Sequence, residues 1–151
     1  MPIATKGSKI DISKESLTAK YARKFSKKLK NGDVIFLYGE IGAGKTTFVR
    51  YLINSLENKK KLKHSEITSP TFSIMNEYEI ENIKIKHYDL FRISDPLEIF
   101  NIGIFNNISD FITLIEWPEK INKMIKEKYN LTFKYNFNTD KRFIMEKKFL
   151  K

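Results

Sequence analysis

The chain has 151 residues, of which 41% are hydrophobic, enough for one globular domain with a sizeable core. It has no cysteine and two histidines, which excludes disulfides, thiolate zinc sites, cysteine nucleophiles and a histidine-rich metal centre. No apolar run approaches the ~18 residues of a membrane span, and the first six residues lack the apolar core of a secretion signal. We therefore expect a cytoplasmic protein.

The net charge of +10 has two interpretations. Lysine and arginine neutralise phosphates, so the charge can mark a nucleic-acid surface. However, only four of the 28 basic residues are arginine, which is preferred for bidentate contacts, and the lysines are spread along the whole chain. We expect no direct, specific nucleic-acid binding, while a general attraction to RNA or to acidic proteins stays open.

The first predicted helix follows a stretch, residues 1–10, that carries little pattern and is expected to be extended or loose. From Leu17 to Leu29 apolar residues recur every four positions, the spacing of one helix face. Ser13 is the expected N-cap, and Asn31-Gly32 is expected to end the helix. We interpret this helix as one that packs against the core.

A glycine-rich segment then lies between an apolar run, Val34–Tyr38, and a helical pattern that runs from Lys45 to about Leu56. The unbroken apolar run is typical of a central parallel strand that is buried on both faces. The segment has the spacing G-x-x-x-x-G-K-[ST] of a phosphate-binding loop, with the strand and helix that this motif requires. We expect the nucleotide to be bound by Gly39, Glu40, Ile41, Gly42, Ala43, Gly44, Lys45, Thr46 and Thr47.

Each residue type in this segment suits a phosphate. Glycines at positions 39, 42 and 44 let the backbone bend and approach the anion with no Cβ in the way. The loop N–H groups and the helix N-terminus present partial positive charge. The Lys45 ammonium is expected to reach the β- and γ-phosphates, and the Thr46 hydroxyl to hold Mg²⁺. The sequence therefore predicts a site for ATP or ADP with Mg²⁺.

The middle of the chain predicts a strand end, a hairpin and a helix. Ile67–Ser73 is interpreted as a strand end passing into a loop, because Pro70 fixes a bend; its hydroxyl side chains suit either an ordinary turn or a switch-like segment. The alternating runs Ser73–Ile80 and Ile83–Tyr88 predict an antiparallel hairpin. A helix is expected to begin at Asp95-Pro96, where Asp95 can cap, and to break at Gly103.

The last third predicts three strands and a short helix. Phe111–Glu116 is an apolar strand that ends in a carboxylate and stops at Trp117-Pro118. A helix over Glu119–Ile125 and two strands, Leu131–Asn136 and Arg142–Phe149, follow. Together the elements predict an α/β fold in a single domain over residues 1–151: a P-loop NTPase-like three-layer sandwich whose central sheet is mostly parallel and carries an antiparallel hairpin.

Two acids are candidates for the carboxylate that phosphate-loop enzymes use to hold Mg²⁺. Glu116 ends an apolar strand, which is the better pattern, so it is our first choice. Asp89, at the end of the hairpin, is the second. Without the phosphate loop, either residue would be interpreted only as a solvated strand end.

Four motifs, in this order and spacing, resemble the bacterial TsaE (YjeE) family: the phosphate loop, Thr68–Phe72, His87–Arg92 and Ile115–Lys120. Family members are small ATPases needed for threonylcarbamoyl modification of adenosine 37 in tRNA. They work with the TsaD and TsaB proteins, of which TsaD carries the transferase chemistry. The resemblance implies a Mg²⁺-dependent ATPase whose ATP hydrolysis drives the cycle of that complex. It also implies that the protein contacts tRNA only indirectly, through the complex, and that it does not bind a membrane.

The resemblance also implies roles for single residues. Lys45, Asp89 and Glu116 are the implied catalytic residues, and Thr46 and Glu116 the implied Mg²⁺ ligands. Trp117 matches the aromatic neighbour of the metal carboxylate, so it joins the expected nucleotide-binding residues. From the residues alone, its indole either faces the cleft or packs in the core beneath it.

The likeness is incomplete at some positions. Thr71 lies in the segment that resembles a switch loop. The sequence departs from the family at two places: Phe91 stands where tyrosine is usual, and Glu40-Ile41 stands where Asp-Leu is usual. The last thirty or so residues match poorly, so we assign no site residues there.

Two other functions stay open. A small-molecule kinase normally has an arginine-rich lid, but after Arg50 the chain holds only Arg92 and Arg142. The second alternative is a module that binds a partner in a nucleotide-dependent way and does not hydrolyse the nucleotide. Because no motif except that of Arg92 places an arginine near the phosphate loop, we expect slow hydrolysis by the chain alone.

Overall fold

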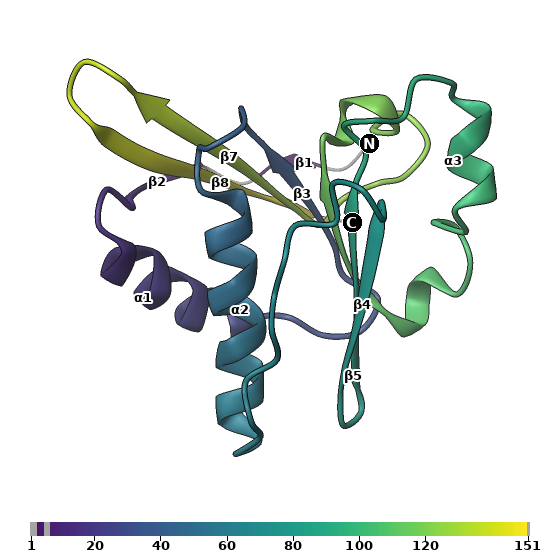
Figure 1. Ribbon diagram of the computed structural model, residues 1–151, viewed down its shortest axis with the longest axis horizontal. Helices are drawn as coiled ribbons and strands as arrows, with labels where there is room; N and C mark the ends of the chain where they lie inside the picture. Colours follow the sequence, from purple (N-terminus) through teal and green to yellow (C-terminus); the bar gives the residue numbers. More distant parts are fainter. Residues whose placement is uncertain (1–2, 5–6, 151) are drawn as a thin grey trace.

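The computed structural model describes residues 3–4 and 7–150, whose strands form one mixed sheet with helices packed on it (Figure 1). The elements in chain order are β1 Ile3–Ala4, β2 Ser8–Asp11, α1 Glu15–Ser26, β3 Val34–Tyr38, α2 Lys45–Lys59, β4 Met75–Ile80, β5 Ile83–Asp89, α3 Leu97–Asn101, η1 Ile108–Asp110, β6 Ile112–Glu116, η2 Pro118–Lys120, β7 Tyr129–Asn136 and β8 Lys141–Leu150, where η marks a 3₁₀ helix.

Four parallel strands form the middle of the sheet, in the order β7-β3-β6-β5. Antiparallel strands extend it on both sides: β4 pairs with β5, and β8 pairs with β7 and also with β1 and β2. The phosphate-loop strand β3 is therefore central, as its apolar sequence predicted. The predicted hairpin is also confirmed, since β4 and β5 pair from Ile80↔Ile83 onward.

Two apolar layers sandwich the sheet, because alternate strand residues face opposite sides. Ile35 and Leu37 of β3 pack in the cluster that includes α1 and α2. Val34 and Phe36 face the other cluster, which includes Ile99 of α3. Figure 1 shows the two long helices on one side of the sheet and α3 on the other. The predicted three-layer α/β fold is confirmed.

The N-terminal stretch is extended, which was one of the two predicted alternatives, but it is paired into the sheet instead of loose. Ser8–Asp11 forms β2, which pairs antiparallel with β8 at the far end of the chain. Local pattern could not show this, because the partner that makes it a strand is so distant in sequence. Residues 1–2 and 5–6 of the predicted loose stretch lie outside the described residues.

The first helix also begins differently from the prediction. Its N-cap is Lys14 rather than Ser13, and it ends at Ser26, before the Asn31-Gly32 turn. The Ser13 hydroxyl instead accepts a bond from the Arg142 backbone N–H at 3.0 Å and lies 3.4 Å from the carbonyl oxygen of the same residue. Ser13 therefore ties the helix start to β8.

Two predicted elements are replaced by irregular backbone. In place of the expected helix over Glu119–Ile125, the chain forms the 3₁₀ helix η2 followed by turns. The helix-like spacing in the sequence comes from Ile121 and Ile125, which pack in the second core cluster. Ile67–Ser73 contains no strand: the Thr68 carbonyl accepts the Asn76 side-chain amide at 3.1 Å, and the Pro70 carbonyl accepts the Ile74 backbone N–H at 2.7 Å. The helix near Asp95 is confirmed but short.

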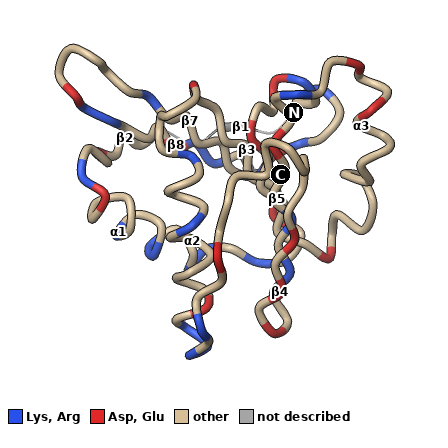
Figure 2. Tube along the Cα trace, viewed as in Figure 1, with Lys and Arg blue, Asp and Glu red and all other residues tan. Residues whose placement is uncertain are grey.

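The charged residues are distributed over the whole fold. Figure 2 shows lysine and arginine on helices, strands and loops in many parts of the described chain, and the absence of specific nucleic-acid binding stays a prediction. Across the described ranges, none of the helices combines the length and the apolar character that crossing a bilayer requires.

Candidate functional site

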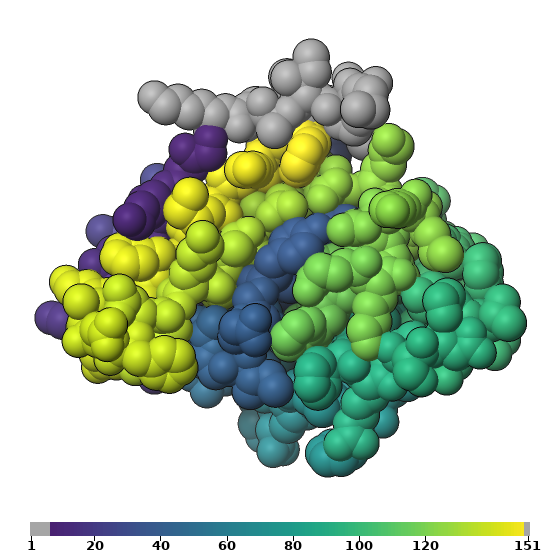
Figure 3. Space-filling view, turned by 90° about the horizontal axis from the view of Figure 1, so that it is seen from above, coloured from purple at the N-terminus to yellow at the C-terminus, as the bar shows by residue number. Residues whose placement is uncertain are grey.

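The candidate site lies where β3, β5 and β6 end. These strands are parallel neighbours, so their carboxyl ends meet at one edge of the sheet, and the register places Asp89 beside Glu116. In Figure 3 the residues of the phosphate loop (blue) lie between the segments that follow β5 and β6 (green) and the β7–β8 hairpin (yellow-green). The pocket has a volume of about 330 Å³ and is lined by Ile41, Gly42, Gly44, Lys45, Thr46, Thr47, Ser69, Thr71, Asp89, Phe91, Glu116 and Trp117.

Two loop glycines are required for different reasons. Gly39 has φ of +146°, and a Cβ there would lie 2.7 Å from the carbonyl oxygen of Phe133 on β7. Gly42 has φ of +83° but open space around it, so only its backbone conformation requires glycine. The sequence suggested phosphate access for both positions, whereas Gly39 is needed for close packing against the neighbouring strand.

Lys45 is the cation of the pocket. Its side chain is buried, its ammonium donates to the Gly39 carbonyl, and its Nζ lies 4.4 Å from the ring centroid of Trp117. Burial lowers the pKa of Lys45, although the nearby charges of Glu116 and Asp89 act in the opposite direction. Among the described residues that line this pocket it is the only lysine or arginine.

Asp89 is held by the segment that follows α2. Its Oδ2 lies 3.2 Å from the Thr71 hydroxyl and 3.5 Å from the Ser69 hydroxyl, and its Oδ1 accepts the Phe91 backbone N–H at 3.0 Å. The two hydroxyls are also 2.8 Å from each other. The segment that the sequence left open between a turn and a switch therefore contacts an acid of the pocket directly.

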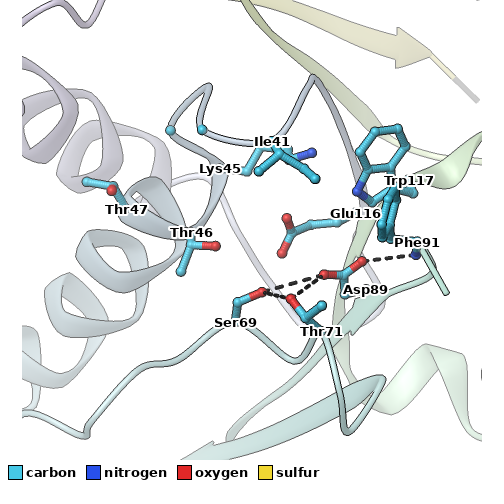
Figure 4. A pocket seen from close by; sticks show the side chains of 12 residues that line it. Ile41, Lys45, Thr46, Thr47, Ser69, Thr71, Asp89, Phe91, Glu116 and Trp117 are labelled. Carbon is cyan, nitrogen blue, oxygen red and sulfur yellow. Dashed lines mark hydrogen bonds between the residues drawn. The ribbon is translucent and has the colours of Figure 1, made fainter.

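The carboxylate of Glu116 contacts the imidazole of His87. The His87 Nε2 lies 2.7 Å from Glu116 Oε2, and both side chains are buried. Within the described part of the chain, no donor bonds to Glu116 Oε1, and His87 Nδ1 has no hydrogen-bond partner. Figure 4 shows the Glu116 carboxylate pointing into the pocket. The contact with His87 therefore fixes one oxygen and leaves the other facing the cavity.

Trp117 lines the pocket and also packs against the second core cluster, so both sequence interpretations hold in part. Its backbone is left-handed, with φ of +58°, directly after β6 ends. The indole is half-buried and lies 4.9 Å from the ring of Phe91, centroid to centroid. One side of the ring system therefore rests on the core while the other faces Lys45.

Most of the expected site residues come together, and three that were expected do not line the pocket. Gly39, Glu40 and Ala43 are absent from its lining, although the Gly39 carbonyl contacts Lys45. Sequence reasoning assigned no role to Phe91 or His87, and it considered Ser69 only as one hydroxyl of the switch-like segment. For His87 a signal existed: it lies two residues before Asp89 on one strand, so both side chains point to the same side.

The oxygen ligands in the pocket suit Mg²⁺. Figure 4 shows the Thr46 hydroxyl facing the carboxylates of Glu116 and Asp89 across the cavity. Mg²⁺ prefers such hard oxygen ligands and keeps several waters, so one hydroxyl and one or two carboxylates suffice beside a phosphate. In residues 3–4 and 7–150 no group of three or more histidine, cysteine, aspartate or glutamate side chains is arranged so that it could hold a metal ion.

Comparison with known proteins gives consistent matches. A family model described as "Threonylcarbamoyl adenosine biosynthesis protein TsaE" matches residues 12–144. A Rickettsia typhi protein named tRNA threonylcarbamoyladenosine biosynthesis protein TsaE is 36% identical over 114 residues, covering 76% of each chain. Proteins of the same name from Aquifex aeolicus and Borreliella burgdorferi are 39% identical over 109 residues and 31% identical over 129 residues. These two matches cover 72% and 83% of this chain, and 75% and 90% of the relatives.

A solved structure supports the fold. The crystal structure of a Bacillus protein, YdiB, superposes with a TM-score of 0.75 at 24% identity, covering 98% of this chain and 87% of that one.

Proposed function

Since the chain belongs to the threonylcarbamoyl adenosine biosynthesis protein TsaE family, which confirms the sequence resemblance, we propose that it is a Mg²⁺-dependent ATPase. In this proposal it supports threonylcarbamoyl transfer to adenosine 37 of tRNA in the cytoplasm. Its partners are the TsaD and TsaB proteins, and its hydrolysis of ATP to ADP drives the cycle of their complex.

One observation carries the proposal: a buried lysine, a helix-start hydroxyl and two strand-end carboxylates share one pocket beside a phosphate loop. Lys45 binds the terminal phosphates and offsets charge as the bond to the γ-phosphorus breaks. Thr46 and Glu116 hold Mg²⁺, which neutralises phosphate charge when it is bound. Asp89, with the hydroxyls of Ser69 and Thr71, orients the attacking water on the opposite side of the pocket from the loop.

Hydrolysis fits this pocket better than transfer to a small-molecule acceptor. A kinase encloses its acceptor phosphate with cationic side chains, and none of the described residues lining the pocket is an arginine. Arg92 lies over the ring of Phe72, 4.1 Å from its centroid, and is exposed. The same shortage predicts slow turnover by the isolated chain, because no cation besides Lys45 stabilises the transition state.

The proposal is tested by measuring phosphate release from ATP by the chain alone and with the TsaB and TsaD proteins, separately and together. We expect slow release alone and a clear stimulation by the partners together. A phosphorylated small molecule in place of free phosphate would favour the kinase, and fast turnover that ignores the partners would contradict the complex. Nucleotide-dependent association without any release would favour a binding module.

Trp117 is expected to report nucleotide binding, because its indole lies 4.4 Å from the lysine that contacts the phosphates. Titration with ATP and Mg²⁺ should change the intrinsic tryptophan emission in a saturable way, since Trp117 is the only tryptophan. The change should vanish in Lys45→Ala and shrink without Mg²⁺. Unchanged emission, with binding shown by calorimetry, would mean that the indole does not sense the ligand.

His87 is expected to act as a positioning residue for Glu116. Replacing it with leucine removes the 2.7 Å contact, and losing such an outer partner typically costs 10–100-fold in metal affinity or activity. The Mg²⁺ concentration for half-maximal phosphate release should therefore rise roughly tenfold or more in His87→Leu. ATP affinity without Mg²⁺ should stay within about twofold, since His87 does not line the pocket.

The matched variant for this test is His87→Gln, which keeps a nitrogen donor near Glu116 and should restore most of the Mg²⁺ response. If leucine and glutamine raise the Mg²⁺ requirement equally, the contact with His87 does not position the carboxylate.

A further inference from the structure

One part of the sheet is covered by helices on only one of its two faces. Apolar residues of β7 and β8, such as Leu131 and Ile144, pack in the cluster that includes α1 and α2. On the opposite face, the second apolar cluster includes Val34 and Phe36 of β3 but, within the described residues, no residue of β2, β7 or β8. Figure 3 views this face and shows β2 (purple), β8 (yellow) and β7 (yellow-green) side by side with no helix in front of them.

This surface, the open sheet face, is rich in lysine. Because strand residues alternate between faces, it consists of every second residue of β2 from Lys9, of β7 from Asn130 and of β8 from Lys141. Four of these eleven residues are lysines, against 28 lysines and arginines among all 151 residues of the chain. The four are Lys9, Lys134, Lys141 and Lys147.

The charge of these lysines is not neutralised within the protein. In residues 3–4 and 7–150, no carboxylate forms an ion pair with any of the four. The one acid of the face, Asp11, accepts the Ser13 backbone N–H at 2.8 Å. The open sheet face therefore suits a ligand that carries several negative charges.

A groove with aromatic walls adjoins the lysines at the tip of the β7–β8 hairpin. Its volume is about 510 Å³, and it is lined by Lys134, Tyr135, Asn136, Phe137, Asn138 and Phe143. Phe137 is 85% exposed, the highest value for a large hydrophobic side chain in the described part of the protein. Its ring lies 4.7 Å from that of Tyr135, centroid to centroid. Packing of the core thus gives no reason for an aromatic ring at this position.

The lysines surround the second aromatic wall of the groove. Lys134 pairs directly with Phe143 in the sheet register, and Lys141 lies two residues before it on β8. The Lys9 Nζ lies 4.3 Å from the centroid of the Phe143 ring. In a single nucleic-acid strand, cations bind the phosphates while aromatic rings stack on the unpaired bases. An acidic protein would match the lysines alone, whereas such a strand matches both the lysines and the aromatic groove.

We propose that the open sheet face and this groove bind an unpaired stretch of RNA, with the lysines on its phosphates and Phe137 stacked on a base. The choice of RNA rests on the proposed function, which acts on a tRNA. The inference goes beyond that function, because the family resemblance implies only an indirect contact with tRNA. Contacts to phosphates and base faces carry little sequence information, so the binding agrees with the expectation of no specific nucleic-acid recognition.

The stacking contact is tested with a fluorescently labelled single-stranded RNA of about twelve nucleotides, whose anisotropy is followed as the full chain is added. In Phe137→Ala we expect about tenfold weaker binding, the scale of one lost stack between a base and an aromatic ring. The Tm should not change, because this ring is exposed. Phe100→Ala, an exposed phenylalanine on α3, is the matched control and should bind RNA normally.

The lysines are tested by the salt dependence of the same binding. For a single strand, the logarithm of the affinity falls with the logarithm of the salt concentration by about 0.7 for each phosphate that is neutralised. The slope should therefore become shallower by about 0.7 in Lys134→Ala, and by about twice that when Lys9→Ala is added. Lys24→Ala, an exposed lysine on α1, should keep the wild-type slope.

Normal RNA affinity in Phe137→Ala, or an unchanged salt slope in Lys134→Ala, would overturn the inference. So would a polyglutamate peptide that loses as much affinity as the RNA in Phe137→Ala, because the ring would then serve an acidic protein and not a base. The proposed function fails or stands separately. Phosphate release that the partners stimulate, in a chain that does not bind RNA, would reject this inference alone. RNA binding that depends on Phe137, in a chain that releases no phosphate, would reject the ATPase alone.

Discussion

Replacing Glu116 with alanine is expected to slow phosphate release from ATP by roughly 10²–10³-fold, because a metal carboxylate supplies several kcal/mol of charge stabilisation in the transition state. Glu116 is suited to this role, since its Oε2 is held by His87 at 2.7 Å and its other oxygen faces the cavity. Nucleotide should still bind, because Lys45 and the loop remain. The measurements are phosphate release at saturating ATP, its Mg²⁺ dependence, and ATP affinity by calorimetry.

The control for this prediction is Glu116→Gln. Alanine leaves the buried imidazole of His87 without its partner, which costs about 1–3 kcal/mol of stability, whereas glutamine keeps a hydrogen bond there. Glutamine should therefore lose the same activity with a nearly normal Tm. If Glu116→Gln hydrolyses ATP with normal Mg²⁺ dependence and Asp89→Asn does not, Asp89 is the metal carboxylate.

The two acids differ in a way that no sequence pattern showed. Both end neighbouring parallel strands, so their adjacency follows from the fold prediction. Asp89, however, is held by backbone and hydroxyl groups, whereas Glu116 is held by one buried histidine. These partners come from other strands and from an irregular segment, and only the folded register brings them into contact.

The phosphate loop and the central strands could be predicted because their information is local. Val34–Tyr38 is an apolar run next to a motif with fixed spacing, and that is enough to place both. The start of α1 could not be predicted in this way, because it depends on the hydrogen bond between Ser13 and Arg142 of the last strand. A cavity of about 260 Å³ beside the loop depends on the same long-range pairing, since its lining includes both Ser13 and Arg142.

Replacing Lys45 with alanine is expected to weaken ATP binding by roughly 10–100-fold, the scale of one charge-assisted contact to phosphate, and to reduce hydrolysis at least as much. Lys45 is the only lysine or arginine among the described residues that line the pocket, and burial makes each of its interactions stronger than in water. The fold should persist, because its ammonium donates only to the Gly39 carbonyl and contacts the Trp117 ring.

The binding of inorganic triphosphate, which lacks the nucleoside, tests whether Lys45 acts on the phosphates. Because Lys45 contacts phosphates, Lys45→Ala should weaken ATP and triphosphate by the same factor, whereas a residue that contacts the nucleoside weakens ATP alone. Lys24→Ala, an exposed lysine on α1, serves as the matched control and should alter neither ligand nor the Tm. Near-normal hydrolysis by Lys45→Ala together with normal affinity for both ligands would show that the loop does not hold the phosphates. Such a result would remove the basis on which Glu116 and Asp89 were assigned their roles.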